Sequence, residues 1–316
     1  MSAPGRPGLP RVSIVIPTRD GAATLPDLID AIARQRVDVP VEVVAIDSSS
    51  TDGTPELLRA RVDRFISIPA DTFDHGATRN AGIAASTGDL VVLTVQDAMP
   101  ADDEWLAALI APLRSDETLA GTFARQRPRA GASILTRRYL AQWSGTSPRA
   151  RVVSVDGPGE FARLTPLERL ERCTFDNVCS CIRRSAWQAH PFRPARIAED
   201  LEWAKTVLLA GHRLAYVPDA VVVHSHERSL RYEFDRTYHV HRQLAALFGL
   251  RTIADVPALA RAMGSSLALH LRCRDEQGRR VPISSAVGLA VVWPLGQYLG
   301  GRSAAGRAAS IRVEPA

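Results

Sequence analysis

The chain has 316 residues, enough for one large α/β domain and an appendage. Apolar residues make up 46% of it, an ordinary share for a globular protein that buries a core. The formal net charge is +5, and a single lysine, Lys205, stands among 39 basic residues. This balance suits anionic partners such as nucleotide diphosphates, nucleic acid or a membrane face, and equally a solvated surface of mixed charge.

The N-terminus, the hydropathy and the cysteines exclude several protein classes. Residues 1–10 are rich in Pro and Gly without an apolar core, so we expect a disordered tail and no signal peptide. No run of 18 apolar residues occurs, so no clear transmembrane helix is expected. The four cysteines form no C-x-x-C pair, which argues against a zinc site and predicts buried free thiols, as in a reducing cytosol.

Short apolar runs alternate with helical patterns over the first 125 residues. We expect strands at 12–16, 41–46, 64–68 and 90–95, followed by helices at 25–34, 51–61, 77–86 and 105–113, respectively. The run 90–95 is apolar throughout, as in a strand buried on both faces. This alternation predicts an α/β fold with a Rossmann-like, mostly parallel sheet flanked by helices.

The rest of the chain is less regular. We expect strands at 119–125, 178–182, 214–217 and 220–224, and helices at 136–143, 199–210, 228–250, 257–272 and 283–299. Residues 147–165, rich in Pro, Gly and Arg, predict a mobile loop that orders over bound donor or acceptor. We therefore divide the chain into a tail at 1–10, a catalytic domain at 11–226 and a C-terminal helical extension at 227–316.

Polar and charged residues follow each of the first four predicted strands. The four stretches are Pro17-Thr18-Arg19-Asp20-Gly21, Asp47 to Gly53, Phe73-Asp74-His75-Gly76 leading to Thr78-Arg79-Asn80, and Gln96-Asp97-Ala98. Ligands of open parallel sheets bind beyond the carboxyl ends of the strands, so we expect these stretches to converge on one site. Their residue types suit a nucleotide diphosphate, which needs a partner for its base, cations for its phosphates and usually a carboxylate-held divalent ion.

Three of these side chains have specific roles in that interpretation. Asp47 can accept from a pyrimidine N–H or a ribose hydroxyl, Arg79 can bind diphosphate oxygens, and Asp97 can hold a metal. Each also has an ordinary structural alternative. Asp47 can cap the following turn, Arg79 can form a surface ion pair, and Asp97 can cap the helix expected after it.

Glu199 and Asp200 begin a predicted helix, where acids interact well with the helix dipole. That capping role is one interpretation. In the other, one carboxylate takes the proton from an attacking hydroxyl. Asp47, Asp97 and Asp200 lie far apart in the sequence, so only a fold can bring them together.

Together these motifs resemble the family-2 glycosyltransferases of the GT-A fold. The stretches that carry the resemblance are Ile14 to Thr18, Asp47 to Gly53, the Gln96-Asp97 pair and Glu199-Asp200. More narrowly, Phe73 to Asn80, Thr94 to Ala98, Phe175 to Val178, Ala198 to Lys205 and His224-Ser225-His226 resemble the bacterial rhamnosyltransferase branch. The resemblance covers residues 12 to 226 and is weaker from 227 onward.

The resemblance implies an inverting, hexosyltransferase-type enzyme and a role for each matching residue. The implied donor-binding residues are Pro17, Thr18, Arg19, Asp47, Ser49, His75, Arg79, Asn80 and Gln96. Asp97, with His224, would hold Mg²⁺ or Mn²⁺, which bridges the diphosphate. Asp200 would be the general base, with Glu199 as the next candidate. Because Gln96 replaces the first acid of the usual D-x-D motif and Ala98 leaves no second one, this motif provides a single carboxylate ligand.

The implied reaction transfers a sugar, with L-rhamnose from dTDP-rhamnose as first choice, in cell-surface polysaccharide or glycolipid assembly. The alternatives are another dTDP- or UDP-linked sugar with a small-molecule acceptor, an inactive nucleotide-sugar-binding protein, or a nucleic-acid-binding module. Aromatic residues make up only 6% of the chain and are not interleaved with basic ones, which argues against nucleic acid. A dinucleotide-dependent oxidoreductase would need G-x-G-x-x-G after the first strand, where the chain has Pro17 to Gly21.

The stretch 283–299 is the most apolar predicted helix, and Arg302, Arg307 and Arg312 follow it. Such a helix beside cations can lie on an anionic membrane, here through residues 281–316, which would suit a lipid-linked glycan as acceptor. Packing on the protein or a dimer contact is the alternative, and Pro294 favours it. The expected location is the cytoplasm, at the inner face of the cell membrane in the first case.

Overall fold

A computed structural model describes residues 10–275 and 277–303. Contacts within the chain divide it into two compact units. The first comprises Met1–Arg127, Ser144–Ala162 and Arg172–His224, and the second Pro128–Trp143, Arg163–Glu171 and Ser225–Ala316. The second unit thus takes in two segments that precede residue 226 in the sequence. The domain boundaries expected above, 11–226 and 227–316, stay a prediction.

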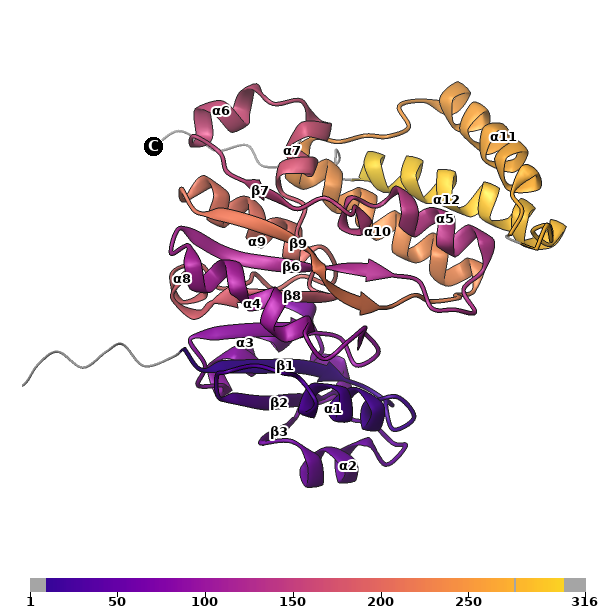
Figure 1. Cartoon of the computed structure of the whole chain (residues 1–316). Coiled ribbons are helices and arrows are strands. Elements are labelled where there is room, and N and C mark those ends of the chain that lie inside the picture. The colour runs from indigo at the N-terminus through magenta and orange to yellow at the C-terminus, as the bar shows by residue number, and fades with distance from the viewer. Residues whose placement is uncertain (1–9, 276, 304–316) are drawn as a thin grey trace, which may run out of the picture. The chain divides into compact units, whose positions relative to one another are not determined.

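The first unit is built on a sheet in which strands far apart in the sequence are neighbours (Figure 1). The strand order is β3-β2-β1-β4-β8-β6-β9-β5, and β7 pairs with β9. The strands are β1 (Val12–Thr18), β2 (Val41–Asp47), β3 (Arg64–Ser67), β4 (Leu90–Thr94), β5 (Met99–Pro100), β6 (Leu119–Arg127), β7 (Arg151–Val153), β8 (Cys179–Arg183) and β9 (Arg213–Val223). The mostly parallel α/β sheet expected from the sequence is confirmed.

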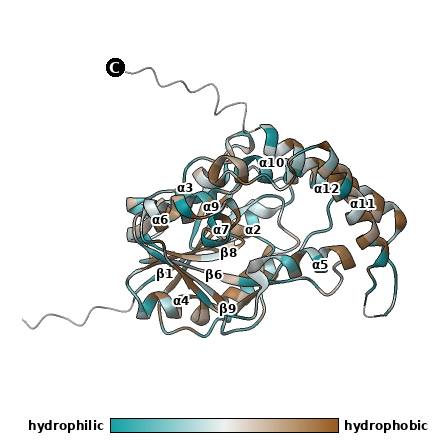
Figure 2. Cartoon of the chain, turned by 90° about the horizontal axis from the view of Figure 1, so that it is seen from above, coloured by the Kyte–Doolittle hydropathy of each residue, from teal (hydrophilic) through white to brown (hydrophobic). Residues whose placement is uncertain are grey.

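The helices of the first unit follow the expected alternation and add short elements to it. They are α1 (Leu25–Ala33), α2 (Thr54–Arg61), α3 (His75–Ala85), α4 (Trp105–Ser115), α6 (Pro158–Arg163), α8 (Arg184–Ala189) and α9 (Glu199–Leu209), with 3-10 turns η1 (Ala70–Thr72) and η2 (Ser144–Thr146). Apolar residues concentrate in the strands and on the helix faces turned to them (Figure 2). Burial of each large aliphatic side chain there stabilises the fold by about 1.5–3 kcal/mol.

One glycine sets how closely α3 packs on the sheet. A Cβ atom on Gly82 would lie 2.4 Å from side-chain atoms of Val15 and of Ile46, on β1 and β2. Only a residue without a side chain fits at that position without movement of these neighbours. The approach of α3 to the sheet positions the first turn of this helix, which carries His75 and Arg79.

Two expectations about the middle of the chain are wrong. The segment 147–165 is not a loop throughout, because it contains β7 and α6. Strand β7 pairs with β9, and the Arg151 guanidinium lies over the rings of Phe123 and Tyr216. The ordering of this segment over a bound donor or acceptor stays a prediction. The two strands predicted at 214–217 and 220–224 form one strand, β9. Its register against β6 shifts between Val217 and Val221, so the residues around Pro218 form an irregularity inside a continuous strand.

The second unit is helical, as expected for the C-terminal appendage. Its helices are α5 (Ile134–Gln142), α7 (Pro166–Arg172), α10 (Leu230–Phe248), α11 (Val256–Arg272) and α12 (Ile283–Ser303). The last residue of α7, Arg172, belongs to the first unit. Helix α12 packs on α10 through small residues, and a Cβ atom on Gly300 would lie 2.3 Å from the carbonyl oxygen of Tyr238. Glycine at this position therefore allows the two helix backbones to approach closely.

Helix α12 is long and apolar enough to cross a membrane by length and composition, with a mean hydropathy of 1.2 over its best window. The sequence contains no unbroken apolar run of this length, because Gly, Ser, Pro and Gln interrupt it. A buried helix of a soluble protein can meet the same criterion, yet only 28% of this window is buried.

The cysteines agree with the expectation from the sequence. Cys173, Cys179 and Cys181 are buried free thiols, and Cys273 is a half-buried one. Burial raises the pKa of Cys173 to about 12 and that of Cys179 and Cys181 further, so these thiols are unreactive at neutral pH.

Candidate functional site

The direction of the strands brings polar residues from distant parts of the first unit to one edge of the sheet. Strands β1, β2, β4, β6 and β9 run in the same direction, because β8 is antiparallel to both β4 and β6 while the other pairings among them are parallel. Their carboxyl ends therefore share an edge. Strand β8 runs the other way, so Asp176 and Asn177, which precede it, lie at that same edge.

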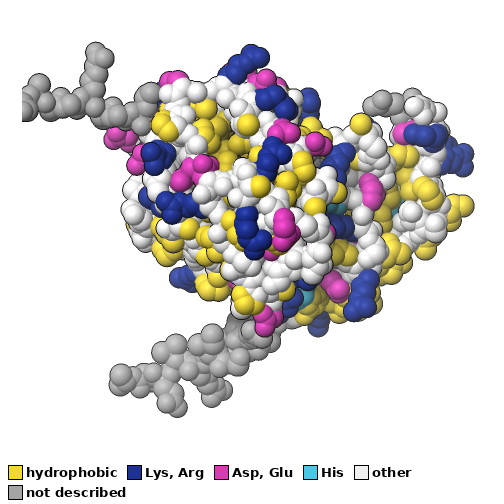
Figure 3. All heavy atoms as spheres, turned by 90° about the horizontal axis from the view of Figure 1, so that it is seen from below, with side chains coloured by type: hydrophobic (Ala, Val, Ile, Leu, Met, Phe, Trp, Pro, Cys, Tyr) yellow, Lys and Arg dark blue, Asp and Glu magenta, His cyan; other side chains and the backbone are white. Residues whose placement is uncertain are grey.

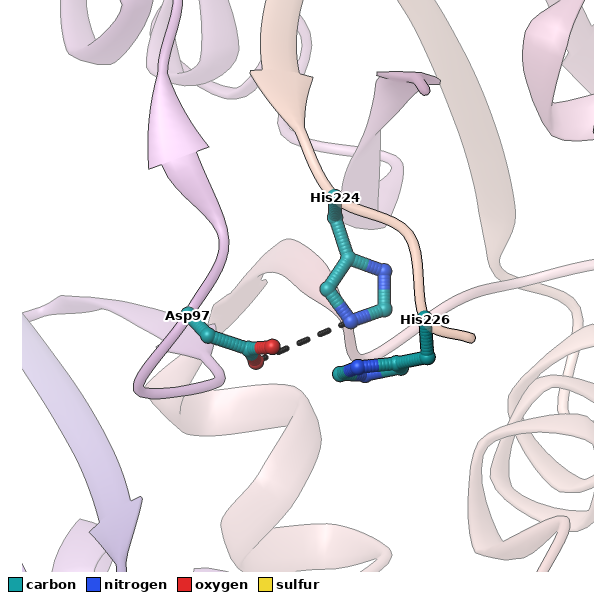
Figure 4. A group of neighbouring side chains, drawn as sticks. All are labelled: Asp97, His224 and His226. Carbon is teal, nitrogen blue, oxygen red and sulfur yellow. Dashed lines mark ion pairs between the residues drawn. The ribbon is translucent and has the colours of Figure 1, made fainter. Parts of the chain in front are cut away.

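A candidate metal centre lies where β4 and β9 end. The Oδ1 atom of Asp97 lies 3.7 Å from Nε2 of His224, and both side chains are largely buried. His226 follows two residues later, and each of the three residues offers a ligand atom within 4.8 Å of the others (Figure 4). Asp97 does not cap the next helix, because Asp102 accepts the hydrogen bond from the Glu104 N–H at that helix start.

These donors fit a divalent ion in type as well as in spacing. One carboxylate and two imidazoles form a set that suits transition metals, and carboxylate oxygen also suits Mn²⁺ and Mg²⁺. Three protein ligands leave coordination positions for diphosphate oxygens. The prediction from the sequence named Asp97 and His224 as ligands, and the structure adds His226 to them.

Gln126, at the end of β6, fixes the orientation of His224. Its Nε2 donates to Oδ2 of Asp176 at 2.5 Å, so its Oε1 faces Nδ1 of His224 at 2.9 Å. An amide oxygen only accepts, so the network assigns the imidazole proton to Nδ1. The lone pair is then on Nε2, the atom that faces Asp97, which is the tautomer that a metal ligand needs.

Neither Gln126 nor Asp176 was assigned a role in the analysis of the sequence. Gln126 lies at the end of a fifth parallel strand, β6, in the position that the polar residues after the first four strands occupy on theirs. Extending the strand-end rule to β6 would have identified it. Nothing in the sequence shows that β8 is reversed, so the position of Asp176 depends on the fold.

Asp200 lies among other carboxylates at the start of α9. It accepts from the backbone N–H groups of Leu201 at 2.8 Å and Asn177 at 3.4 Å. Burial raises the pKa of Asp200 well above its usual value, and the carboxylates of Glu199 and Asp176 raise it further. A carboxyl group with a raised pKa is a stronger base once it is ionised.

Glu199 has a different environment from Asp200, although the two are adjacent. Its Oε1 lies 2.8 Å from Nη1 of Arg79, and both side chains are almost fully buried. Asn177 also donates to this carboxylate, at 3.2 Å. Glu199 thus compensates the buried charge of Arg79. Among the described residues, no cation lies within ion-pair distance of Asp200.

The first turn of α3 is buried around this ion pair. Arg79 also donates to Nδ1 of His75, at 3.2 Å, and to the carbonyl of Asn177, at 3.4 Å. Burial lowers the pKa of His75, and Arg79 adds to this effect while the carboxylates of Glu199 and Asp74 oppose it. The ion pair considered for Arg79 is therefore present, but it is buried and not at the surface.

The remaining donor-site candidates hold the loops at this edge together. Asp47 is fully buried and accepts from the backbone N–H of Ser50 at 3.0 Å, so the capping alternative for this residue is observed. The Gln96 amide pairs with both backbone groups of Arg19, at 2.8 and 2.9 Å, which joins the loops after β1 and β4. Ser49 donates to the carbonyl of Ile68.

Thr18, Pro17 and Asn80 complete the set. Thr18 is buried and donates to the carbonyl of Ile46, and Pro17 is half-buried beside it on β1. Asn80 binds the backbone of Phe192 through both ends of its amide and accepts from Trp187. Its amide groups are thus occupied by the chain itself.

Backbone strain also concentrates at this edge. Among the described residues other than glycine, positive φ angles occur at Asp20 (46°), Ser49 (57°) and Ala198 (63°). The first two lie in the loops after β1 and β2, and Ala198 directly precedes Glu199. Such conformations cost about 1–3 kcal/mol each and cluster at functional sites.

Comparison with known proteins shows which family the chain belongs to. The chain matches the family described as Glycosyl transferase family 2 over residues 13–197, which is more than half of its length. It is 29% identical over 234 residues to the O-antigen chain rhamnosyltransferase RfbN of Salmonella typhimurium, covering 72% of this chain and 70% of that protein.

Solved structures share the fold at low sequence identity. The mannosyltransferase PcManGT from Pyrobaculum calidifontis, in complex with GDP-Man and Mn²⁺, has a TM-score of 0.54 at 19% identity and covers 97% of this chain and 77% of its own. Glucosyl-3-phosphoglycerate synthase from Mycobacterium tuberculosis, in complex with Mn²⁺, UDP and glucosyl-3-phosphoglycerate, has a TM-score of 0.55 at 21% identity and covers 80% of this chain and 88% of its own. With the family match, these likenesses establish that the chain is a glycosyltransferase of family 2 with the GT-A fold.

Proposed function

We propose that this glycosyltransferase moves L-rhamnose from dTDP-rhamnose to an acceptor hydroxyl, with inversion at the anomeric carbon. The observation that carries the proposal is the similarity to an O-antigen chain rhamnosyltransferase over 72% of the chain. The product would belong to a cell-surface polysaccharide or glycolipid, built on a lipid-linked acceptor. The enzyme would work in the cytoplasm, at the inner face of the cell membrane.

Asp200 is the proposed general base. An acceptor hydroxyl loses its proton to this carboxylate as its oxygen attacks the anomeric carbon from the face opposite the leaving nucleotide. The raised pKa of Asp200 favours that transfer, since a base is most effective when its pKa is near the working pH. Glu199 is the weaker candidate, because Arg79 and Asn177 already bind its carboxylate.

Asp97, His224 and His226 are the proposed ligands of Mn²⁺ or Mg²⁺. When bound, the ion neutralises charge that develops on the diphosphate leaving group. Two imidazole ligands favour Mn²⁺ over Mg²⁺, since imidazole suits transition metals better. Gln126 and Asp176 hold His224 in the tautomer that presents Nε2.

The loops after β1 and β2 form the proposed base and ribose pocket. Asp47 holds the loop after β2 by accepting from the Ser50 N–H, and Gln96 holds the loop after β1 by accepting from the Arg19 N–H. Arg19 is exposed, so it is the cation of this group that can reach a phosphate directly. Arg79 is buried, and its guanidinium group forms an ion pair with Glu199 inside the first unit.

The test is a panel of nucleotide sugars in which slow donor hydrolysis is measured with Mn²⁺ and without acceptor. We expect dTDP-rhamnose to be cleaved faster than UDP-glucose, UDP-N-acetylglucosamine and GDP-mannose. Faster cleavage of another donor would contradict the assignment of dTDP-rhamnose and indicate a different branch of the family. Binding of nucleotides without cleavage of any donor, and without transfer to any acceptor, would favour an inactive protein.

A further inference from the structure

A wide groove lies within the second unit, away from any strand. It encloses about 1320 Å³, more than the 300–1,000 Å³ typical of pockets for small ligands. Its walls come from the start of α5, the start of α10, the segment between α11 and α12, and the first turns of α12. All of the residues that line it belong to the second unit.

The groove carries a strong excess of positive charge. Among the described residues, seven arginines line it, against two acids, Glu227 and Asp275. Both acids are engaged: Glu227 accepts from the Ser133 N–H at 2.7 Å, and Asp275 pairs with Arg279 at 2.5 Å.

Six of the seven arginines have no carboxylate partner among residues 10–275 and 277–303, and the exception is Arg279. Arg137 binds backbone carbonyl groups, and Arg228 lies over the ring of Tyr232. The other four are Arg138, Arg272, Arg274 and Arg280. Three of them, at 272, 274 and 280, lie in and beside the short segment that joins α11 to α12 and are exposed. Guanidinium groups that are unpaired and gathered in one groove suit phosphate oxygens, which they bind in a forked geometry.

Exposed apolar side chains surround this charge. Among the described residues, 13 large hydrophobic side chains are exposed, and 11 of them belong to the second unit, although it is the smaller one. Leu230 and Leu269 line the groove itself. Ile283, Val287 and Val291 follow along α12 at four-residue spacing and are 72%, 44% and 41% exposed. On the right of Figure 3, the side on which Figure 1 places α11 and α12, hydrophobic and basic side chains share the surface.

We propose that this groove binds the phosphate headgroup of an anionic membrane lipid while the exposed face of α12 enters the acyl boundary. Cations beside an aliphatic helix face match both parts of such a lipid. No aromatic side chain is found among the described residues that line the groove, so these offer no stacking platform of the kind that single-stranded nucleic acid uses. The proposal rests on the membrane location proposed above and adds to it the site and the chemistry of the lipid.

Vesicle co-sedimentation of the full chain tests the proposal. We expect the protein to pellet at low salt with vesicles of equal parts phosphatidylcholine and phosphatidylglycerol and to stay in solution with phosphatidylcholine alone. The groove variant Arg272→Gln/Arg274→Gln/Arg280→Gln should weaken this binding by on the order of a hundredfold, given the contribution of each basic residue near an anionic surface. The variant Val287→Ser/Val291→Ser should weaken vesicle binding at moderate salt as well, because salt screens the attraction between charges and not the contact of apolar side chains with the lipid.

A matched control removes the same charge from exposed positions of the same unit outside the groove. It is Arg163→Gln/Arg231→Gln/Arg261→Gln, and it should retain most of the binding. Equal losses in the two triple variants would assign the effect to net charge and overturn the site. The site would also be overturned if the parent protein stays in solution with the anionic vesicles. The same holds if inorganic phosphate or a single-stranded oligonucleotide displaces the protein from the vesicles as effectively as lipid does.

Donor hydrolysis by the same variants separates this proposal from the proposed function. The groove variant should hydrolyse the preferred donor within about twofold of the parent, because the arginines lie outside the candidate catalytic site. Lipid binding without hydrolysis of any donor in the parent would leave the groove assigned and count against the proposed enzyme. Circular dichroism with thermal melting of each variant excludes unfolding as the cause of a loss.

Discussion

Asp200 differs from Glu199 in its partners, although the two residues are adjacent and chemically alike. Glu199 is paired with Arg79, whereas the charges that act most strongly on Asp200 are the carboxylates of Glu199 and Asp176, with Arg79 as a smaller, opposing one. A buried acid without a cation is costly to ionise, which is the ordinary cause of a raised pKa. The burial of Asp200 therefore destabilises the fold when the carboxyl group is ionised, and it also makes the carboxylate a stronger base.

We predict that Asp200→Asn folds, still binds the donor nucleotide and loses sugar transfer by on the order of 10²-fold or more. In the parent, transfer should rise with pH through the raised pKa of Asp200, so the acid limb lies above the range of an ordinary aspartate. Steady-state kinetics from pH 5 to about 9 would measure both effects. Turnover within a fewfold of the parent would move the base to Glu199 or elsewhere.

The same residue has a predicted effect on stability with a defined sign. Its pKa is higher in the folded protein than in the unfolded chain, so the folded state holds the proton more tightly. That contribution to stability is present at low pH and is lost as the pH rises through the folded-state pKa. Asp200→Asn should therefore melt at a higher temperature than the parent at pH 8, with a difference that shrinks toward pH 5. A lower melting temperature at pH 8 would contradict the burial argument.

Gln126 offers a test of the metal centre that does not depend on activity. Gln126→Leu removes the acceptor that fixes the His224 tautomer, and loss of such a partner typically weakens metal binding by about 10–100-fold. Titration calorimetry with Mn²⁺ would measure the change. Gln188→Leu, the same substitution at an exposed position on α8, is the control and should bind Mn²⁺ as the parent does. Equal affinities in the two variants would remove Gln126 from the metal centre.

Helices α10 and α12 show how single positions decide the packing of an element. Gly300 faces the backbone of α10, where a Cβ atom would lie 2.3 Å from the Tyr238 carbonyl oxygen. Gly264, in the middle of α11, would place its Cβ atom in open space. The two glycines therefore have opposite expected effects when replaced, although both lie in helices of the same unit.

We predict that Gly300→Ala destabilises the second unit by about 1–3 kcal/mol, because the helices must separate to admit the methyl group. Gly264→Ala should stabilise it by about 0.4–1 kcal/mol through the entropy of the unfolded chain. Chemical denaturation monitored by circular dichroism compares the two. If Gly300→Ala is as stable as Gly264→Ala, α12 does not pack on α10 as described. The same packing makes deletion of α12 a poor test of membrane binding, since it would expose α10.

At the scale of the whole molecule, ligand binding should be visible as stability. A nucleotide that binds only the folded protein stabilises it by mass action, by about 2.7 kcal/mol at a hundredfold excess over Kd. We predict that dTDP with Mn²⁺ raises the melting temperature, and that Asp97→Asn removes the metal-dependent part of the shift. An unchanged Mn²⁺-dependent shift in Asp97→Asn would place the ion elsewhere.

The sequence by itself determined the α/β class, the succession of strands and helices through α4, and the strand ends that carry polar residues. It could do so because hydrophobic period and strand-end position are local properties of the chain. Its errors are also local in origin. Pro, Gly and Arg between residues 147 and 165 predicted a loop, and two strands were expected at 214–217 and 220–224. Pairing within the sheet instead produces β7 in the first segment and one continuous strand, β9, in the second.

The tertiary structure alone decided which of these residues meet. The reversal of β8 brings Asp176 beside Gln126 and Asp200, and the ion pair between Arg79 and Glu199 joins positions 120 residues apart. Likewise, the arginine groove combines segments from the middle and the end of the chain. Sequence patterns report which face of an element is apolar. They do not report which distant element covers that face, and the burial that follows sets the pKa values, the tautomer and the ion pairs on which the chemistry depends.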